Sequence, residues 1–312
     1  MDKKPPRDGY GEAILELCKD KDNVIILDTD VAKSTRTVWV KDKYPEKFID
    51  IGISEQDMVG VAAGLSSEGF VPFGAAYGVF LSGRAFDQIR TTVCYDKLNV
   101  KLIGAHAGIS VGPDGATHQA LEDMALMSVL PNMTLIAPCD SNEAKKATLA
   151  VYEHEGPCYI RFGREAIPQI TDENTPFTIG KANVLAEGDD CTVFACGAMV
   201  YEALEARKQL LEQNVSISVI NVHTIKPLDK ETVLKYAKIT KAAVVTQEHQ
   251  ETGGLNGVVS QLLSKEYPIP LGFVSINDTF GESGNPDELM EKYGLNHKNI
   301  IKITITINID SI

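Results

Sequence analysis

The sequence alternates between short apolar runs and longer segments in which apolar residues recur every three or four positions. Continuous apolar runs are typical of strands buried on both faces, and helical segments between them favour parallel strands, because a parallel connection needs a crossover. The pattern predicts an α/β fold with a mostly parallel sheet and helices on both faces. The expected strands of the first half are 23–30, 47–54, 70–77, 99–108, 133–138 and 157–163, and the expected helices are 54–68, 81–95 and 141–155, the last capped by Ser141 or Asn142.

A second unit of the same kind follows a break at about 165–190, which is rich in Pro, Thr, Asp, Glu and Gly. We therefore expect two domains, 1–185 and 186–312, each a mostly parallel sheet with helices on both faces. The tail 302–309 alternates strictly between apolar and polar residues, so it predicts a strand with one dry face or an edge strand that pairs with another subunit. The other expected elements are strands within 191–197, 215–229, 242–249 and 270–276 and helices at 198–214 and 253–266.

Composition narrows the class of partner. Lys and Arg total 30 and Asp and Glu total 43, which gives a net charge of −13. A negative field of this size disfavours nucleic acid and anionic membrane surfaces as partners. No run approaches the ~18 apolar residues of a membrane span, and no apolar stretch follows the first lysines, so we expect no signal peptide. The six cysteines form no C-x-x-C pair; we expect them to be reduced and buried in a cytoplasmic protein.

The acidic residue Glu55 stands where the strand 47–54 runs into an apolar helix. As a first-turn carboxylate it is favoured by the helix dipole, with Ser54 as the expected cap and Asp57 as its partner. That structural role is one interpretation. The other is a ligand site, because ligands of parallel sheets bind at the carboxyl ends of the strands. A carboxyl desolvated there could keep a proton long enough to donate it.

Further polar and aromatic residues follow the next strands. Tyr77 and Phe80 come at the end of 70–77 and are either core residues or a wall for a flat heteroaromatic ring. His106, Asp114 and His118 lie in a loop punctuated by glycines, whose backbone is expected to approach a ligand. The spacing fits no zinc pattern, so proton transfer is the favoured use of the histidines.

Four arginines are candidates to meet an anionic ligand: Arg7, Arg84, Arg90 and Arg164. Most surface arginines are only solvated. Arg164 stands just beyond the strand 157–163, and an arginine at that end of a sheet is suited to clamp a phosphate.

Five stretches together resemble the second half of transketolase, and most closely the bacterial form that is split over two polypeptides: GISEQDMVGVAAGL, RAFDQIR, GPDGATHQALEDMALM, PNMTLIAPCD and YIRFGRE. The likeness runs from about residue 7 to about residue 300. It implies a pyrimidine-binding domain for thiamine diphosphate at 1–185 and a transketolase C-terminal domain at 186–312. The family's diphosphate domain carries a G-D-G motif, and the nearest stretch here, EGDD at 187–190, lacks the second glycine.

The resemblance therefore implies an N-terminal transketolase subunit as partner, which would hold the diphosphate and a Mg²⁺ or Ca²⁺ ion in an α2β2 heterotetramer, with no metal on this chain. It implies transfer of a two-carbon ketol unit between sugar phosphates, as in the pentose phosphate pathway. Glu55 and His118 would be catalytic, Glu55 by bonding N1′ of the pyrimidine. Cofactor contacts would come from Glu55, Met58, Tyr77 and Phe80, and substrate contacts from Arg7, Ser34, His106, Asp114, His118 and Arg164.

Two positions depart from the family pattern. Pro113 stands before Asp114 where full-length enzymes usually have an acid, and Gly83 stands near where some relatives place a third aromatic.

Other readings stay open. Sibling thiamine enzymes, such as 1-deoxyxylulose-5-phosphate synthase or the β subunit of a 2-oxo acid dehydrogenase E1, share parts of the pattern, although the stretch THQALEDMALM favours transketolase. Ser34 could be only a turn serine. A non-catalytic assembly or regulatory subunit is the remaining alternative, against which Glu55, Asp114 and His118 argue.

Overall fold

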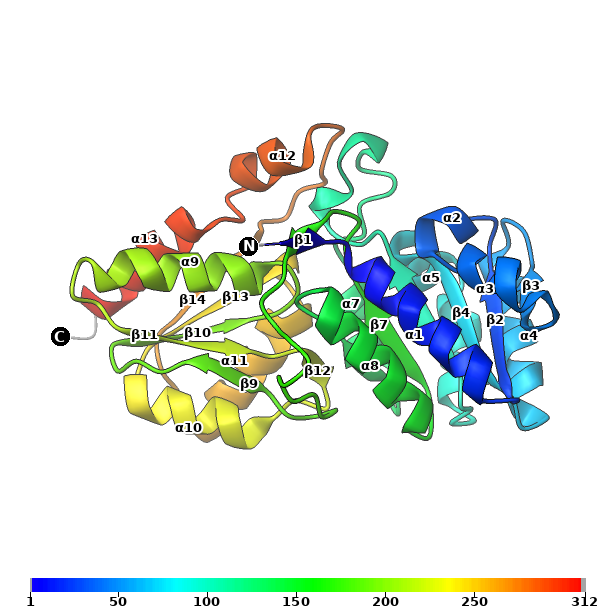
Figure 1. Ribbon diagram of the computed structural model, residues 1–312. Coiled ribbons are helices and arrows are strands. Elements are labelled where there is room, and N and C mark those ends of the chain that lie inside the picture. The colour runs from blue at the N-terminus through cyan, green and yellow to red at the C-terminus, as the bar shows by residue number, and fades with distance from the viewer. Residues whose placement is uncertain (1, 310–312) are drawn as a thin grey trace.

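A computed structural model describes residues 2–309, which form two α/β lobes lying side by side (Figure 1). The first lobe holds a seven-stranded sheet in the order β12-β6-β7-β5-β4-β2-β3, and every pairing in it is parallel except that of β12 with β6. The expected α/β class is thus confirmed. The strands are β2 (Val24–Asp28), β3 (Phe48–Asp50), β4 (Val71–Tyr77), β5 (Lys101–Ala105), β6 (Thr134–Ile136), β7 (Cys158–Arg161) and β12 (Thr224–Lys226).

Helices cover this sheet because its central strands are apolar on both faces. All five residues of β5 are buried, as are the first six of β4, so neither face can be left to water. The helices of this lobe are α1 (Pro6–Asp20), α2 (Ala32–Thr35), α3 (Val38–Lys43), η1 (Pro45–Lys47), α4 (Glu55–Ser67), α5 (Gly78–Arg84), α6 (Phe86–Gln88), the π-helical η2 (Ile89–Cys94), η3 (Ile109–Asp114), α7 (Asp123–Val129) and α8 (Ser141–Glu153).

The second lobe holds a five-stranded sheet in the order β14-β13-β10-β11-β9, in which only β9 runs antiparallel to its neighbour. The strands are β9 (Asn183–Ala186), β10 (Cys191–Ala195), β11 (Ile217–Asn221), β13 (Ala243–Gln250) and β14 (Leu271–Ile276), and the helices are α9 (Met199–Leu211), α10 (Lys230–Thr240), α11 (Gly254–Glu266), α12 (Pro286–Lys292) and α13 (His297–Ile309).

The two lobes share structure. The strand β12 leaves the second half of the chain to pair with β6 at the edge of the first sheet. Between the lobes, β1 (Lys3–Lys4) pairs with β8 (Ile167–Pro168), and Figure 1 shows β1 at the junction. The expected strand and turn at 215–229 is therefore two strands, one in each sheet.

The expected cap of α8 was wrong, and the expected cap of α4 was right in position but not in bonding. Asp140, not Ser141 or Asn142, caps α8, and its carboxylate accepts from the Glu143 amide at 2.8 Å. Ser54 precedes α4 but makes no capping hydrogen bond through its side chain. The single helix expected at 81–95 is instead α5, α6 and the π-helical η2 in succession.

The predicted strand at 302–309 was also wrong, because this segment belongs to the helix α13. The segment alternates between apolar and polar residues, as a strand would, but its isoleucines also recur at the helical spacing of three to four positions. The packing of these isoleucines against the second sheet fits the helix. Ile300 is completely buried, and Ile303 packs on Gly272 of β14. A Cβ added to Gly272 would lie 2.2 Å from Ile303 Cγ2.

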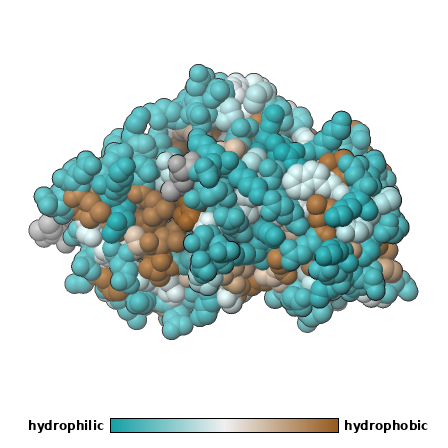
Figure 2. All heavy atoms as spheres, viewed as in Figure 1, coloured by the Kyte–Doolittle hydropathy of each residue, from teal (hydrophilic) through white to brown (hydrophobic). Residues whose placement is uncertain are grey.

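The six cysteines are buried and unpaired, as expected. Within residues 2–309, none of the helices combines the length and the apolar character that crossing a bilayer requires. The face of the molecule in Figure 2 is mostly hydrophilic; its largest patch of apolar residues lies on the second lobe, and smaller patches lie on the first.

Candidate active site

The predicted site residues come from segments that follow different strands of the first sheet. Ser34 follows β2, Glu55 follows β3, Tyr77 ends β4 and His106 follows β5. These strands are parallel, so their carboxyl ends meet at one edge, which is where α/β sheets bind ligands. Arg164 follows β7 at the same edge, and Arg7 reaches it from the start of α1.

Glu55 is the first residue of α4, and its side chain is only 4% exposed. Arg84 at the end of α5 donates from Nη1 to Glu55 Oε2 at 3.2 Å. The same guanidinium lies over the ring of Phe80, 4.1 Å from its centroid. Glu55 is therefore a buried carboxylate beside an aromatic face, and Arg84 is a contact that the sequence reasoning did not find.

Four of the predicted residues form a group of ring contacts next to Arg84. The ring of Tyr77 is parallel to those of Phe80 and His106, with centroid distances of 6.4 and 4.5 Å. His118 meets Phe80 edge-on at 5.1 Å and Tyr77 edge-on at 6.1 Å. Four of the predicted residues thus form one continuous surface, with partly exposed Tyr77, Phe80 and His118 at its open side.

A basic group lies on the other side of Tyr77. Arg7 Nη1 lies 3.4 Å from His106 Nε2 and donates to the Ser34 carbonyl at 3.3 Å, while the Tyr77 hydroxyl donates to Ser34 Oγ at 3.1 Å. His106 holds a left-handed φ of 53°, which is uncommon for a residue other than glycine. Ser34, Tyr77, His106 and Arg7 are thus in direct contact.

The electrostatics of this basic group favour an anion. Burial, together with the positive charges of Arg7, Arg164 and Arg36, lowers the pKa of His106 to about 3, so the ring is neutral at pH 7. Burial and Arg36 also lower the pKa of Arg7. Arg36, which the sequence reasoning missed, sits at the end of α2 with Nε 2.6 Å from Asp8 Oδ1.

Two buried polar atoms here have no hydrogen-bond partner within the described residues: Arg7 Nε and His106 Nδ1. Buried polar groups are normally satisfied, so each calls for a partner. An oxyanion is the group that clustered guanidinium and imidazole donors bind best.

Asp114 and His118 occupy the loop after β5, and this loop rests on the second lobe. Gly112 has a φ of +77°, and a Cβ on it would lie 2.8 Å from Pro286 Cγ; one on Gly108, with a φ of +93°, would lie 2.2 Å from Glu248 Oε1. These glycines were expected to let backbone approach a ligand, whereas they let the loop pack on the second lobe. Asp114 Oδ1 lies 3.4 Å from Arg164 Nη1.

Met58 is placed differently from the other predicted residues. It is completely buried, and its Cε would lie 3.2 Å from a Cβ on Gly74 of β4. Its observed contact is therefore the packing of α4 on the sheet, beneath the surface that carries Tyr77 and Phe80. As for metal, no cluster of three His, Cys, Asp or Glu side chains among residues 2–309 is placed to hold an ion.

A buried ionic network joins the lobes behind the site. Arg161 Nε donates to both carboxylate oxygens of Asp123 at 3.2 Å, and Arg161 Nη2 donates to the Glu248 carbonyl at 2.6 Å. Burial alone would lower the pKa of Arg161, but Asp123 and Glu248 raise it. Glu248 Oε1 in turn accepts from the Ser110 amide at 2.7 Å, so the network also holds the start of the loop that carries Asp114.

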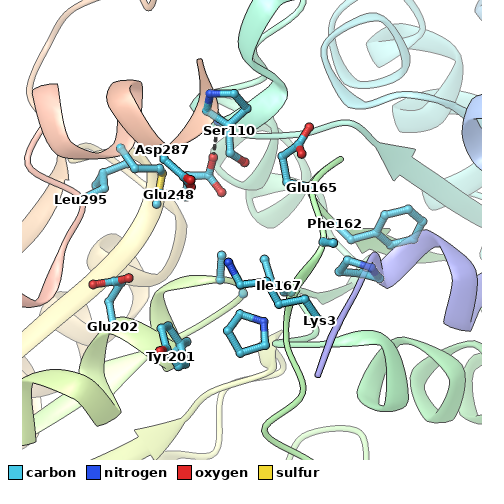
Figure 3. Close-up of a pocket in the computed structure, with 18 of the residues that line it drawn as sticks. Lys3, Ser110, Phe162, Glu165, Ile167, Tyr201, Glu202, Glu248, Asp287 and Leu295 are labelled. Atoms are coloured by element: carbon cyan, nitrogen blue, oxygen red, sulfur yellow. Dashed lines mark hydrogen bonds between the residues drawn. The ribbon is translucent and has the colours of Figure 1, made fainter. Parts of the chain in front are cut away.

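The same junction contains a cavity of about 300 Å³, shown in Figure 3. Lys3, Phe162 and Glu165 line it from the first lobe, and Tyr201 and Glu202 from the second. None of the predicted site residues lines it, so the cavity is separate from the surface formed by Tyr77, Phe80 and His118.

Comparison with known proteins agrees with this geometry. The transketolase pyrimidine-binding domain family matches residues 3–169, and the transketolase C-terminal domain family matches residues 180–300. A putative transketolase C-terminal section of Methanocaldococcus jannaschii is 42% identical over 303 residues, covering 96% of this chain and 95% of that protein. The 6-deoxy-6-sulfo-D-fructose transketolase subunit SqwH of Clostridium sp. is 40% identical over 296 residues, covering 95% and 92%.

Solved structures give the same assignment. A structure described as a split gene transketolase, inactive beta4 tetramer, superposes with a TM-score of 0.90 at 40% identity and covers 98% of this chain and 99% of that one. A transketolase of Campylobacter jejuni, 21% identical, shares the fold with a TM-score of 0.85, and this chain spans 47% of its length. The chain therefore belongs to the transketolase family and corresponds to the C-terminal subunit of a transketolase divided between two chains.

Proposed function

We propose that this chain is a subunit of a thiamine-diphosphate-dependent enzyme that transfers a two-carbon ketol unit from a ketose phosphate to an aldose phosphate. Residues 1–185 would bind the pyrimidine end of the cofactor, and residues 186–312 would form the C-terminal domain. The observation that carries the proposal is the buried carboxylate of Glu55 at the ligand-binding edge of a parallel sheet, linked through Arg84 to the face of Phe80, which stacks with Tyr77.

The residues present fit the pyrimidine end of the cofactor. Phe80 offers a partly exposed ring for stacking, and Glu55 offers a buried carboxyl that is linked to the face of this ring through Arg84. Gly83 leaves room beside them, since a Cβ on it would meet no atom within 4 Å. Held there, thiamine diphosphate would supply a nucleophilic carbon for a ketone substrate and a sink for the electron pair of a C–C bond that is broken.

In this proposal Glu55 holds a hydrogen bond to N1′ of the ring and shares a proton there, which promotes proton loss elsewhere on the cofactor. Met58 supports α4 from below. His118 is oriented by Thr117, whose Oγ1 lies 2.9 Å from Nδ1, so Nε2 can contact the reacting oxygens of the sugar. Asp114 would accept from a substrate hydroxyl.

The basic group would bind the substrate's anionic end. Arg7, Ser34, His106 and Arg164 were predicted for this role, and Arg36 adds a further positive charge. Arg7 Nε and His106 Nδ1 support it, because both are buried polar atoms without a hydrogen-bond partner within the described residues, and such atoms normally have one. In a chain of net charge −13, such a group is a local exception.

The partner is proposed from what this chain lacks in sequence. The EGDD stretch at 187–190 is not a G-D-G motif, so an N-terminal subunit would supply the diphosphate and the Mg²⁺ or Ca²⁺ site, in an α2β2 heterotetramer. The solved relative described as a split gene transketolase, inactive beta4 tetramer, supports this arrangement, since a tetramer of beta chains is described there as inactive. We place the enzyme in the cytoplasm and in pentose phosphate metabolism.

The reaction class is tested with the two-chain complex and thiamine diphosphate. Xylulose 5-phosphate plus ribose 5-phosphate is offered in one assay and pyruvate in another. Ketol transfer without release of CO₂ is expected. Turnover of pyruvate would instead favour a sibling thiamine enzyme. A relative named as a 6-deoxy-6-sulfo-D-fructose transketolase subunit makes a sulfonated ketose a useful third substrate, because a sulfonate presents similar oxygens to the basic group.

A further inference from the structure

Arg84 makes two contacts at once in the candidate active site. Its Nη1 donates to Glu55 Oε2 at 3.2 Å, and its guanidinium lies 4.1 Å from the centroid of the Phe80 ring. Phe80 and Arg84 both lie on α5, four positions apart, so Arg84 stands one helical turn beyond Phe80 on the same face of the helix. Gln56 Nε2 donates to the Arg84 carbonyl at 3.0 Å and fixes the backbone at this point.

These are the two contacts that the proposed function assigns to the pyrimidine ring. A guanidinium is flat, stacks on aromatic faces and presents N–H donors in its plane to a carboxylate. A pyrimidine ring on Phe80 with its edge at Glu55 would occupy the same volume. Arg84 and the ring therefore cannot both hold these positions.

We propose that Arg84 is a displaceable gate of the pyrimidine site, an inference that rests on the proposed function. In the gated arrangement Arg84 covers Phe80 and neutralises Glu55, and it swings outward when the cofactor ring enters. The gate keeps the buried carboxylate paired, since an unpaired buried charge is strongly destabilising.

The surroundings of Arg84 suit such a movement. Its side chain is 51% exposed, whereas that of Glu55 is 4% exposed, so Arg84 is the member of the pair that can leave for water. A long cationic side chain keeps its charge solvated after it turns outward. The preceding residue, Gly83, has open space where a Cβ would be, so no side chain there blocks the swing.

The gate should lower the apparent cofactor affinity in proportion to the fraction of sites in which Arg84 leaves the site open. If Arg84 is seated about 90% of the time, only about a tenth of the sites are open, and affinity falls about tenfold. Removing the side chain should recover this factor.

The experiment is a calorimetric titration of thiamine diphosphate with Mg²⁺ into the two-chain complex, which measures binding and not turnover. The variants are Arg84→Ala, Arg84→Lys and the control Arg90→Ala, which removes an exposed arginine on the neighbouring η2. We expect Arg84→Ala to bind the cofactor about five- to tenfold more tightly. Arg84→Lys keeps the cation but loses the flat group, so it should gain less, and Arg90→Ala should bind like wild type.

The outcomes separate the two proposals. If the wild-type complex binds no thiamine diphosphate, the proposed function fails. If it binds and Arg84→Ala binds equally or more weakly, the gate is refuted and Arg84 is a residue that stays in place beside the ring. Thermal unfolding and gel filtration show whether each variant folds and assembles. If Arg84→Ala does not fold or assemble, Arg84→Gln decides instead. Its side chain is uncharged, so the Arg84→Gln complex should also bind the cofactor more tightly than the wild-type complex does.

Discussion

Replacing Arg161 tests whether the buried network couples the two lobes. Arg161 and Asp123 are 4% and 0% exposed in their side chains. In Arg161→Met, Asp123 still accepts the hydrogen bond from the Tyr159 hydroxyl at 3.2 Å but no longer has a cationic partner. The Glu248 carbonyl loses the hydrogen bond that Arg161 Nη2 donates to it at 2.6 Å. Breaking one side of a buried pair costs about 3–5 kcal/mol, which is a large part of the ~5–15 kcal/mol that holds a folded protein.

The assay is urea unfolding followed by circular dichroism, with Arg164→Met as the matched control. Arg164 is 34% exposed and pairs with Asp114 at 3.4 Å, so its loss should cost no more than about 1 kcal/mol. Because Arg161 bonds the second lobe directly, Arg161→Met should also separate the transition into two. Arg161→Met combined with Asp123→Leu should be less destabilised than Arg161→Met alone. A midpoint for Arg161→Met equal to that of Arg164→Met would refute the reasoning.

Three further predictions concern stability. His106 is neutral in the fold down to a pKa of about 3 but takes up a proton below about 6.5 when unfolded. Its contribution is therefore complete above pH 6.5 and is lost as the pH falls toward 3. Between pH 7.5 and 5.0 the chain should lose about 2 kcal/mol through this group, and urea midpoints of His106→Asn should show a correspondingly smaller loss; an unchanged slope would contradict the assignment. Gly104→Ala should destabilise by about 3 kcal/mol or more, because its Cβ would lie 1.9 Å from the hydroxyl of fully buried Tyr159. Gly64→Ala, at a helical position with open space, should instead stabilise the fold by about 1 kcal/mol. Equal urea midpoints for Gly104→Ala and Gly64→Ala would count against the packing of Tyr159 on Gly104. Ile300→Ala should cost about 2–4 kcal/mol in the same assay, since Ile300 is a completely buried residue of α13, whereas the exposed Thr306→Ala should change little.

The sequence was sufficient for the fold class and for the edge of the sheet that carries the site. Continuous apolar runs identified the buried strands, and polar residues placed just after them, such as Glu55 and His106, were therefore expected to meet. The tail 302–309 was misassigned because alternating Ile and Thr also place isoleucines at helical spacing. The packing of Ile303 on Gly272 and the burial of Ile300 accompany the helix, and neither contact can be read from the sequence.

Contacts between distant segments were beyond sequence reasoning. Arg84 had been noted as a basic residue, but its pairing with Glu55 depends on where the short α5 ends relative to α4. Arg36 joins the basic group only because a left-handed turn at φ 74° follows α2. The glycines at 108 and 112 were correctly associated with close backbone approach, but the approaching group belongs to the second lobe.

The most direct test of the account is the activity of the two-chain complex carrying Glu55→Gln. Glutamine preserves the size of the side chain and a hydrogen bond to the ring, but it cannot exchange a proton at N1′. We expect assembly and thiamine diphosphate binding to persist while ketol transfer falls by about 10²–10⁴-fold. Ketol transfer at the wild-type rate by a fully assembled Glu55→Gln complex would contradict the central claim that this carboxyl is the proton-sharing group of the active site.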